Sequence, residues 1–400
     1  MHAESPRDRV IDLARQTYGA GWRPAQVAEA PGRLELLGNH VDYNGGLVLA
    51  GAIDRVVAIA SSESGHHATI EVIAGDLASE AVTIRLEDCR DWTTTSEKIG
   101  PVDYARGVIA SLLCRDLEVR GGLQLSIAGN VPIGFGMSSS AGLCVALVLT
   151  LACTEPEERD IVAIARETEH RCGSPVGAMD QSASVAGGVI LFDGRDASYT
   201  PLDPHLGEYV FAVADSGITH ALGTSSYPAR VAESQEALGI IKAAATPNLG
   251  SLGEMTPEAW EMARSDLASR LSPLLVSRVD HVVSEVARVR LGIEAVKSSD
   301  WQAFGQLMTE SGRSSNQNYQ ISHPKVEELV AELLGIDGVA GARMMGGGEG
   351  GPALALIHRE AVPQVAATVE RGFFQRNVSH LQGDRLQVCA FGPAARIDQM

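Results

Sequence analysis

The first third of the 400-residue chain contains short runs in which apolar and polar residues alternate between Gly, Asp and Asn. Alternation with a period of two predicts β-strands, and apolar residues spaced three and four apart predict helices. The predicted strands are residues 56–60, 69–74, 82–86 and 123–129, and the predicted helices are 104–115, 141–153 and 157–171.

A polar stretch with two prolines, at residues 200–207, interrupts this pattern. Four hundred residues exceed what one hydrophobic core usually serves, so we predict two domains, 1–205 and 206–400. The second half contains predicted strands at 208–217, 353–358 and 386–392, a predicted helix at 364–374 and an almost wholly helical segment at 228–310. Strands gathered in two places indicate the α+β class.

Charge and composition exclude some function classes. The net charge of −18, from 32 basic and 50 acidic residues, argues against a nucleic-acid partner or an anionic membrane surface. The longest apolar run, residues 141–153, is too short to cross a bilayer, so we expect a buried helix in a soluble cytoplasmic protein. Six cysteines lie far apart, which favours reduced thiols over disulfides or a metal site.

The segment APGRLELLGNHVDYNGG, residues 30–46, places an amide, an imidazole, a carboxylate and a phenol between glycines. These are Asn39, His40, Asp42 and Tyr43. Burying such a cluster is costly unless something binds it. The alternative is a strand followed by a hairpin, with a turn at residues 44–45 and solvated polar side chains.

A second glycine-rich segment, GNVPIGFGMSSSAGL at residues 129–143, joins a predicted strand to an apolar helix. Glycines let successive N–H groups point at one anion, and a helix start adds its dipole. The segment therefore predicts a phosphate-binding loop, with a simple serine N-cap as the alternative. The chain has no Walker A sequence.

Two further segments have ambiguous chemistry. Residues 341–357 contain G-x-G-x-x-G, but a strand-like run follows where a dinucleotide fingerprint requires a helix, so we reject that interpretation. Asp180 follows a Gly- and Pro-rich passage after Glu167 and Glu169 on a predicted helix. It is either a helix N-cap or an acid/base residue.

These motifs, in this order, resemble those of the GHMP kinase superfamily, which includes galactokinase, homoserine kinase, mevalonate kinase and phosphomevalonate kinase. Within it the chain is most similar to the galactokinase family, from about residue 28 to the last predicted strand. The similarity includes residues 225–231, 271–283 and 305–315. It implies a ribosomal-protein-like amino-terminal domain, a ferredoxin-like carboxy-terminal domain and a site between them that transfers the ATP γ-phosphate to the anomeric hydroxyl of a sugar.

The resemblance also assigns residues. Asp180 matches the family's catalytic aspartate and Arg33 the arginine beside it. The ATP-phosphate loop matches residues 134–140, with Gly134, Gly136, Ser138, Ser139 and Ser140 as the binding residues. Ser139 or Ser140, together with Glu169, are the expected Mg²⁺ ligands, since Mg²⁺ prefers hard oxygens. The spacing to Asp180 is one residue shorter than usual, so Glu167 is a rival to Glu169.

For the sugar, the resemblance implies contacts from Asn39, His40, Asp42 and Tyr227. Galactokinases usually carry Glu where this chain has Asn39, and that Glu contacts the sugar near its C6 hydroxyl. A neutral Asn removes a charge that would repel a uronate. Glu349 also departs from the family, which usually has an aromatic residue there.

The expected activity is therefore an ATP-dependent galactose 1-kinase, with a small sugar and ATP as its partners. Two segments, residues 180–183 and 311–319, look more like galacturonokinase and arabinose kinase, so these are alternative activities. An alternative of another class is a catalytically silent sugar-binding regulator.

Overall fold

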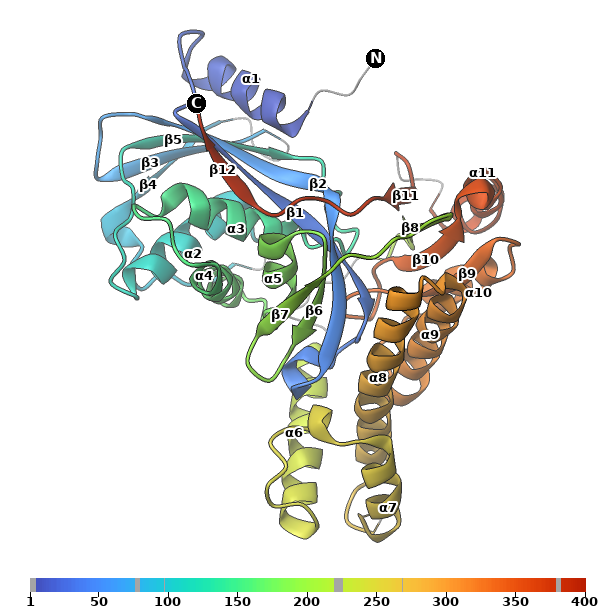
Figure 1. Cartoon of the computed structure of the whole chain (residues 1–400). Coiled ribbons are helices and arrows are strands. Elements are labelled where there is room, and N and C mark those ends of the chain that lie inside the picture. The colour runs from blue at the N-terminus through green and yellow to red at the C-terminus, as the bar shows by residue number, and fades with distance from the viewer. Residues whose placement is uncertain (1–4, 76–79, 97, 219–225, 268, 379–382) are drawn as a thin grey trace.

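The computed structural model describes residues 5–75, 80–96, 98–218, 226–267, 269–378 and 383–400. Two β-sheets organise this part of the chain, one of eight strands and one of four. Figure 1 shows the larger sheet among helices α1 to α5, while the smaller sheet packs beside helices α8 to α11. The α+β class is confirmed, because most strand pairs are antiparallel and helices cover the sheets without strict alternation.

The larger sheet has the strand order β12-β1-β2-β5-β3-β4, and β6 joins it through β2 and carries β7. Its strands are β1 (Gln26–Leu37), β2 (Leu47–Glu63), β3 (Thr69–Ala74), β4 (Val82–Arg85), β5 (Leu123–Gly129), β6 (Val189–Asp193), β7 (Ser198–Leu202) and β12 (Arg396–Gln399). The predicted strand at 56–60 is thus only the middle of a 17-residue strand. The second half of β2 pairs with β5 and the first half pairs with β6, so this one strand has a different neighbour at each of its ends.

Helices cover both faces of the larger sheet. They are α1 (Pro6–Tyr18), α2 (Pro101–Leu113), α3 (Ser139–Leu151), α4 (Glu158–Arg171) and α5 (Met179–Ala186). Helix α1 packs on one face through a small apolar cluster that includes Val10, Trp22 and Ala58. Helix α3 is buried from Ala141 to Leu151, as its continuous apolar sequence predicts, and packs against β1 and β2 on the other face.

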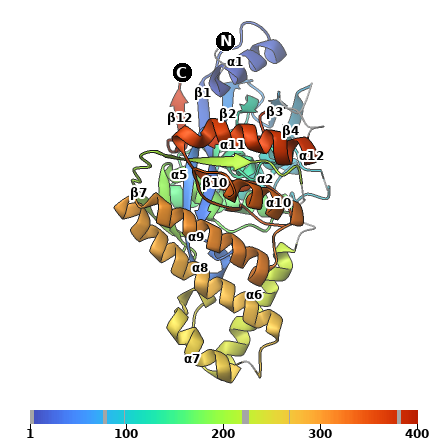
Figure 2. The same cartoon turned by 90° about the vertical axis from the view of Figure 1, so that its right-hand side faces the viewer.

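The second sheet is antiparallel in the order β11-β8-β10-β9. Its strands are β8 (Tyr209–Ala214), β9 (Val339–Met344), β10 (Ala353–His358) and β11 (Leu386–Cys389). The helices of this half are α6 (Tyr227–Ala244), α7 (Pro257–Leu267), α8 (Pro273–Ser298), α9 (Trp301–Ser314), α10 (Pro324–Leu334), α11 (Val362–Val369) and α12 (Gln375–Asn377). Helices α6 and α7 project beyond the sheets, as Figures 1 and 2 both show.

The predicted division near residue 205 falls between β7 and β8, which belong to different sheets. The chain then returns, because β12 pairs antiparallel with β1, Gln26 opposite Gln399. One continuous hydrophobic cluster also joins residues from both halves. The division into 1–205 and 206–400 stays a prediction, and the first sheet contains a strand from the second range.

All six cysteines are free, and Cys114 is exposed whereas four of the others are buried. No helix in the described part of the chain is both long enough and apolar enough to cross a membrane. The apolar run at 141–153 forms helix α3 within the core.

Candidate active site

Strand β1 and helix α5 bring Arg33 and Asp180 together. Arg33 Nε donates to Asp180 Oδ1 at 2.7 Å and Nη2 to Oδ2 at 2.6 Å, a bidentate ion pair in which the arginine is only 6% exposed. Burial alone would lower the pKa of Arg33, but the charge and hydrogen bonds of Asp180 raise it. Asp180 lies in the first turn of α5 and the N-cap is Ala178, so the N-cap interpretation of Asp180 is wrong.

The glycine-rich segment before α3 curls against this ion pair. Gly134 and Gly136 have φ of 82° and 61°, and Ser138 has φ of 53°. Arg33 Nη1 donates to Gly136 O at 2.6 Å, and Ser138 Oγ donates to Asp180. Ser138 occupies the N-cap position of α3, but within the described residues its side chain makes no capping hydrogen bond, and Ser138, Ser139 and Ser140 line a cavity beside the helix start.

A second, largely apolar cavity adjoins this segment at Ser139 and Ser140. It has a volume of about 380 Å³, and its walls include Ile99 before α2, Tyr104 of α2, Val131 of the loop after β5 and Leu143 of α3. Such a cavity can take a flat apolar group attached to an anion held at the helix start.

Glu169 and Glu167, the two rival carboxylates, lie on different sides of α4. Glu169 is 3% exposed, lines the same cavity as Ser139 and Ser140, and accepts from Gln181. Burial, reinforced by the charge of Asp180, raises its pKa to about 7. Glu167 instead pairs with Arg115 and Arg171 on the outer side of the helix.

The segment 38–46 connects β1 to β2, which pair antiparallel, so the hairpin interpretation describes its backbone correctly. A 3₁₀ turn at Asp42–Asn44 and a left-handed Gly45 close it. The side chains, however, are not solvated, since Asn39, His40 and Asn44 are buried. The hairpin interpretation is thus right for the backbone and wrong for these three side chains, and ligand binding by the segment stays a prediction.

Asp42, His40 and Tyr227 line a small cavity that also has Arg33 and Asp180 in its wall. Burial raises the pKa of Asp42 to about 7. Gly177 from the loop before α5 allows this approach, because a Cβ there would lie 1.8 Å from Asp42 Oδ2. The wall thus combines hydrogen-bond acceptors with aromatic surface.

Aromatic rings surround His40 from three elements. Its ring centroid lies 4.9 Å from that of Tyr227, 5.5 Å from Tyr319 and 5.7 Å from Tyr43. Tyr43 forms hydrogen bonds to His40 Nδ1 at 2.9 Å and to Tyr319 at 3.0 Å. Burial lowers the pKa of His40 to about 3, so the imidazole is neutral and positions its neighbours rather than carrying charge.

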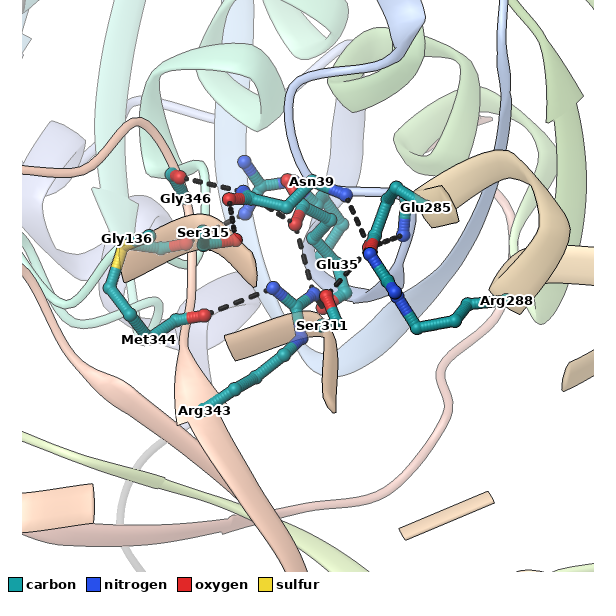
Figure 3. Close-up of polar contacts among 12 residues, drawn as sticks. Glu35, Asn39, Gly136, Glu285, Arg288, Ser311, Ser315, Arg343, Met344 and Gly346 are labelled. Atoms are coloured by element: carbon teal, nitrogen blue, oxygen red, sulfur yellow. Dashed lines mark hydrogen bonds and ion pairs between the residues drawn. The ribbon is translucent and has the colours of Figure 1, made fainter. Parts of the chain in front are cut away.

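Asn39 is fully buried and is absent from the described residues that line this cavity. Its Nδ2 donates to Glu35 Oε1 at 2.9 Å and to Gly346 O at 3.0 Å, and its Oδ1 accepts from Ser315 Oγ at 3.0 Å (Figure 3). The predicted contact between Asn39 and the substrate stays a prediction, and in the structure the side chain makes these three hydrogen bonds inside the protein. Its partner Glu35 does line the cavity, together with Asp42 and Asp180.

Helix α8 fixes the backbone of the same segment. Glu285 Oε1 accepts from the amides of Gly38 and Asn39 at 3.0 and 3.1 Å, and Oε2 pairs with Arg288 at 2.7 Å. His281 Nε2 bonds to Asn39 O at 2.9 Å. Burial opposes ionisation of Glu285, but the arginine charge and hydrogen bonds lower its pKa to about 2.

Sequence reasoning did not single out Glu35, Tyr319 or Glu285. Glu35 follows Arg33 by two residues on one strand, and that spacing puts both side chains on one face. The spacing could therefore have identified Glu35 from the sequence as a neighbour of Arg33. Glu285 and Tyr319 contact the segment across more than 240 residues, so only the tertiary structure identifies them.

Glu349, in the loop between β9 and β10, has its carboxylate at the start of α6, where Oε2 accepts from the amide of Ser226 at 3.0 Å. It has φ of 57° and is absent from the described residues lining the two polar cavities. Its carboxylate thus stabilises the helix start that presents Tyr227.

Comparison with known proteins agrees with this geometry. The models "GHMP kinases N terminal domain" and "GHMP kinases C terminal" match residues 103–188 and 293–375, and the fold is that of a GHMP kinase. The model "Galactokinase galactose-binding signature" matches residues 15–63.

Curated relatives narrow the class. A galactokinase of Chloroflexus aggregans is 34% identical over 376 residues, covering 90% of this chain and 91% of the relative, and that of Homo sapiens is 32% identical over 374 residues, with 90% of each covered. The chain belongs to the galactokinase family.

Solved structures give the same result. Galactokinase of Lactococcus lactis complexed with galactose superposes with a TM-score of 0.85 at 25% identity, over 97% of this chain and 98% of that one. L. major mevalonate kinase, at 16% identity and a TM-score of 0.61, shares the fold over 94% of this chain and 99% of its own.

Proposed function

We propose that this protein is an ATP-dependent sugar kinase that phosphorylates the anomeric hydroxyl of galactose. The observation that carries the proposal is the position of the Arg33–Asp180 pair, which lies in the walls of both the acceptor-lined cavity and the cavity of the glycine-rich segment. A sugar in the first and a triphosphate in the second would meet at this pair. The curated relatives and the galactose-complexed structure support the choice of sugar.

The chemistry follows from the groups present. Asp180 would accept the hydroxyl proton as the sugar oxygen bonds to the γ-phosphorus and the bond to the bridging oxygen of ADP breaks. Arg33 orients that carboxylate through two hydrogen bonds and faces the transferring group with its positive charge. The amides at the start of α3 would hold phosphate oxygens, and the apolar cavity beside Ser139 would take the base.

Mg²⁺ fits this site by its donor set. One cavity wall contains two hydroxyls and a buried carboxylate, those of Ser139, Ser140 and Glu169. A cation there would offset the charge repulsion between Glu169 and Asp180. When bound, the ion would neutralise charge on the phosphate oxygens. Glu169 is preferred to Glu167, which is occupied by two arginines.

The cavity favours a neutral sugar. Glu35, Asp42 and Asp180 all line it, and the charge of Arg33 is already paired with Asp180. A galacturonate carboxylate would meet this acidic wall at a cost, which argues against the uronate alternative that neutral Asn39 suggested. The intact Arg33–Asp180 pair argues against a silent regulator. ATP use and six free cysteines fit the reducing cytoplasm.

A coupled ADP-release assay with galactose, galacturonate, arabinose and N-acetylgalactosamine tests the proposal. Galactose should give the highest kcat/KM, and phosphorus NMR of the product should show the coupling of an anomeric phosphate. A preference for galacturonate or arabinose would replace the sugar. Sugar binding without turnover of any of the four would favour the regulator.

A further inference from the structure

The wall of the sugar cavity contains a carboxylate that the proposed chemistry leaves unused. Resting on the proposed function, we propose that Glu35 is a specificity-determining residue that accepts a hydrogen bond from a sugar hydroxyl, and that Asn39 holds Glu35 in place from behind. Glu35 contacts the ligand, and Asn39 orients the Glu35 carboxylate.

Glu35 points into the sugar cavity because of its place on β1. Arg33 and Glu35 pair with Ala52 and Ala50 of β2 in an unbroken stretch of ladder, so both side chains leave the same face of the strand. Two residues of strand separate them by about 7 Å, roughly the width of a pyranose ring. A sugar with its anomeric hydroxyl at Asp180 therefore turns its opposite side toward Glu35.

The Glu35 carboxylate is oriented with one oxygen held and the other open. Oε1 accepts from Asn39 Nδ2 and from Arg343 Nη2, both at 2.9 Å (Figure 3). Among the described residues no hydrogen bond reaches Oε2. This oxygen is not completely buried, so it is open to a ligand in the cavity. Glu35 lines the cavity while only 5% exposed, so Oε2 is an oriented acceptor.

Arg343 fixes the charge of this arrangement. It is fully buried, donates to Glu35 O at 2.6 Å as well as to Oε1, and bonds to Met344 O at 3.0 Å. A buried guanidinium requires a carboxylate partner, and Glu35 is the one within 2.9 Å. The ion pair holds the Glu35 carboxylate at its place in the cavity wall.

The neutral side chain at position 39 is explained by the same contacts. The Asn39 amide donates to Glu35 and to Gly346 O, two acceptors that a carboxylate at this position would repel. The neighbouring backbone already faces a second buried carboxylate, Glu285. Asn39 is thus the donor that a carboxylate at position 35 requires.

The test pairs a side-chain change with substrate changes. In Glu35→Gln, kcat/KM for galactose should fall about 10- to 100-fold, the range expected for loss of a charged hydrogen bond. One of the two sugars 4-deoxygalactose and 6-deoxygalactose lacks the contacted hydroxyl. For that sugar, Glu35→Gln should change kcat/KM less than about threefold, because its complex with the wild-type protein never had the hydrogen bond. Galacturonate should become a better substrate relative to galactose, a change that structural damage would not produce.

The exchange variant Glu35→Asn with Asn39→Glu provides a second test, since Arg343 would otherwise lose its partner. It keeps one carboxylate and one amide, and its Tm should exceed that of Asn39→Glu alone, which places two carboxylates together. Equal losses on galactose and both deoxy sugars in Glu35→Gln, with an unchanged galacturonate ratio, would overturn the role of Glu35. Failure of the wild-type protein to phosphorylate any galactose-series sugar would instead overturn the proposed function.

Discussion

Two loops meet at the Arg33–Asp180 pair and are built in opposite ways. The sugar loop, residues 38–46, is mostly buried and is tied by side chains of α8 and of the π-helix Ser315–Tyr319 and by a backbone carbonyl of the loop after β9. The phosphate loop, residues 132–140, is half-buried or exposed apart from Met137. Its described hydrogen bonds with Arg33 and Asp180 use two carbonyls and a hydroxyl.

The difference corresponds to the ligand each loop is expected to take. A neutral sugar gives few strong contacts, so discrimination requires acceptors fixed in advance with every other polar atom satisfied. A triphosphate is recognised by any array of amide donors, and glycines that bring the backbone close are sufficient. The sugar loop depends on distant parts of the chain, whereas the phosphate loop depends on its own sequence.

The largest effect should come from the residue the two loops share. Asp180→Asn removes the proton acceptor, so kcat should fall about 10²- to 10⁴-fold. The ATP dissociation constant, measured by calorimetry, should stay within a few-fold. Ser138→Ala, which loses one hydrogen bond to the same carboxylate, is the milder control. An Asp180→Asn enzyme with more than a tenth of wild-type activity would contradict the mechanism.

Next in size is the effect of untying the sugar loop. Glu285→Gln leaves Arg288 without its buried partner, and we expect the free energy of unfolding to fall by about 3 kcal/mol. Because the pKa of Glu285 is lowered to about 2, its contribution is present above its ordinary value of 4.5 and is lost as pH falls from there toward 2.

Urea denaturation at pH 7 and pH 3 measures this effect. Glu294→Gln is the matched control, since Glu294 lies on the same helix with a 71% exposed side chain and an exposed pair with Lys297. It should cost less than about 0.5 kcal/mol. Equal costs for the two variants would show that Glu285 does not anchor the loop.

A smaller, local effect should follow changes in the phosphate loop. Gly136 has φ of 61°, and a Cβ added there would lie 2.8 Å from Pro352. In Gly136→Ala, KM for ATP should therefore rise about tenfold with little change in Tm. Gly134→Ala is the control, with a positive φ and open space among the described residues, and isolates backbone strain. If Gly136→Ala raises KM for galactose instead, the assignment of the loops is wrong.

The smallest effect is a proton released when the sugar binds. The pKa of Asp42 is raised to about 7 by burial, so at pH 6 the free protein mostly carries the acid form. Sugar hydroxyls that donate to the carboxylate favour ionisation, and binding should release a fraction of a proton at pH 6 and almost none at pH 8. Calorimetry in buffers of different ionisation enthalpy measures this, and Asp42→Asn should abolish the difference.

The sequence predicted the phosphate loop more completely than the sugar loop. Glycines, serines and a helix start are local signals, and Gly134 to Ser140 lie together as expected. Asp42 and Tyr227 were named through family resemblance, and the structure brings both to the cavity. The role of Asn39 could not be predicted, because its partners Ser315 and Gly346 lie about 300 residues away in sequence.

The fold shows the same division between local and distant signals. Strands β3 and β5 have the predicted bounds, because period-two alternation is local. The length of β2 and the pairing of β12 with β1 were not predicted, since both depend on which strands lie alongside.

The pairing of β12 with β1 also sets the order in which the molecule can be completed during synthesis. Gln26 and Gln399 are 373 positions apart, so β1 leaves the ribosome with one edge without this partner until residues 396–399 have been made. An open edge is a template for pairing with another chain. This edge of β1 is therefore open to pairing with another chain until β12 is available, and pairing with β12 closes it.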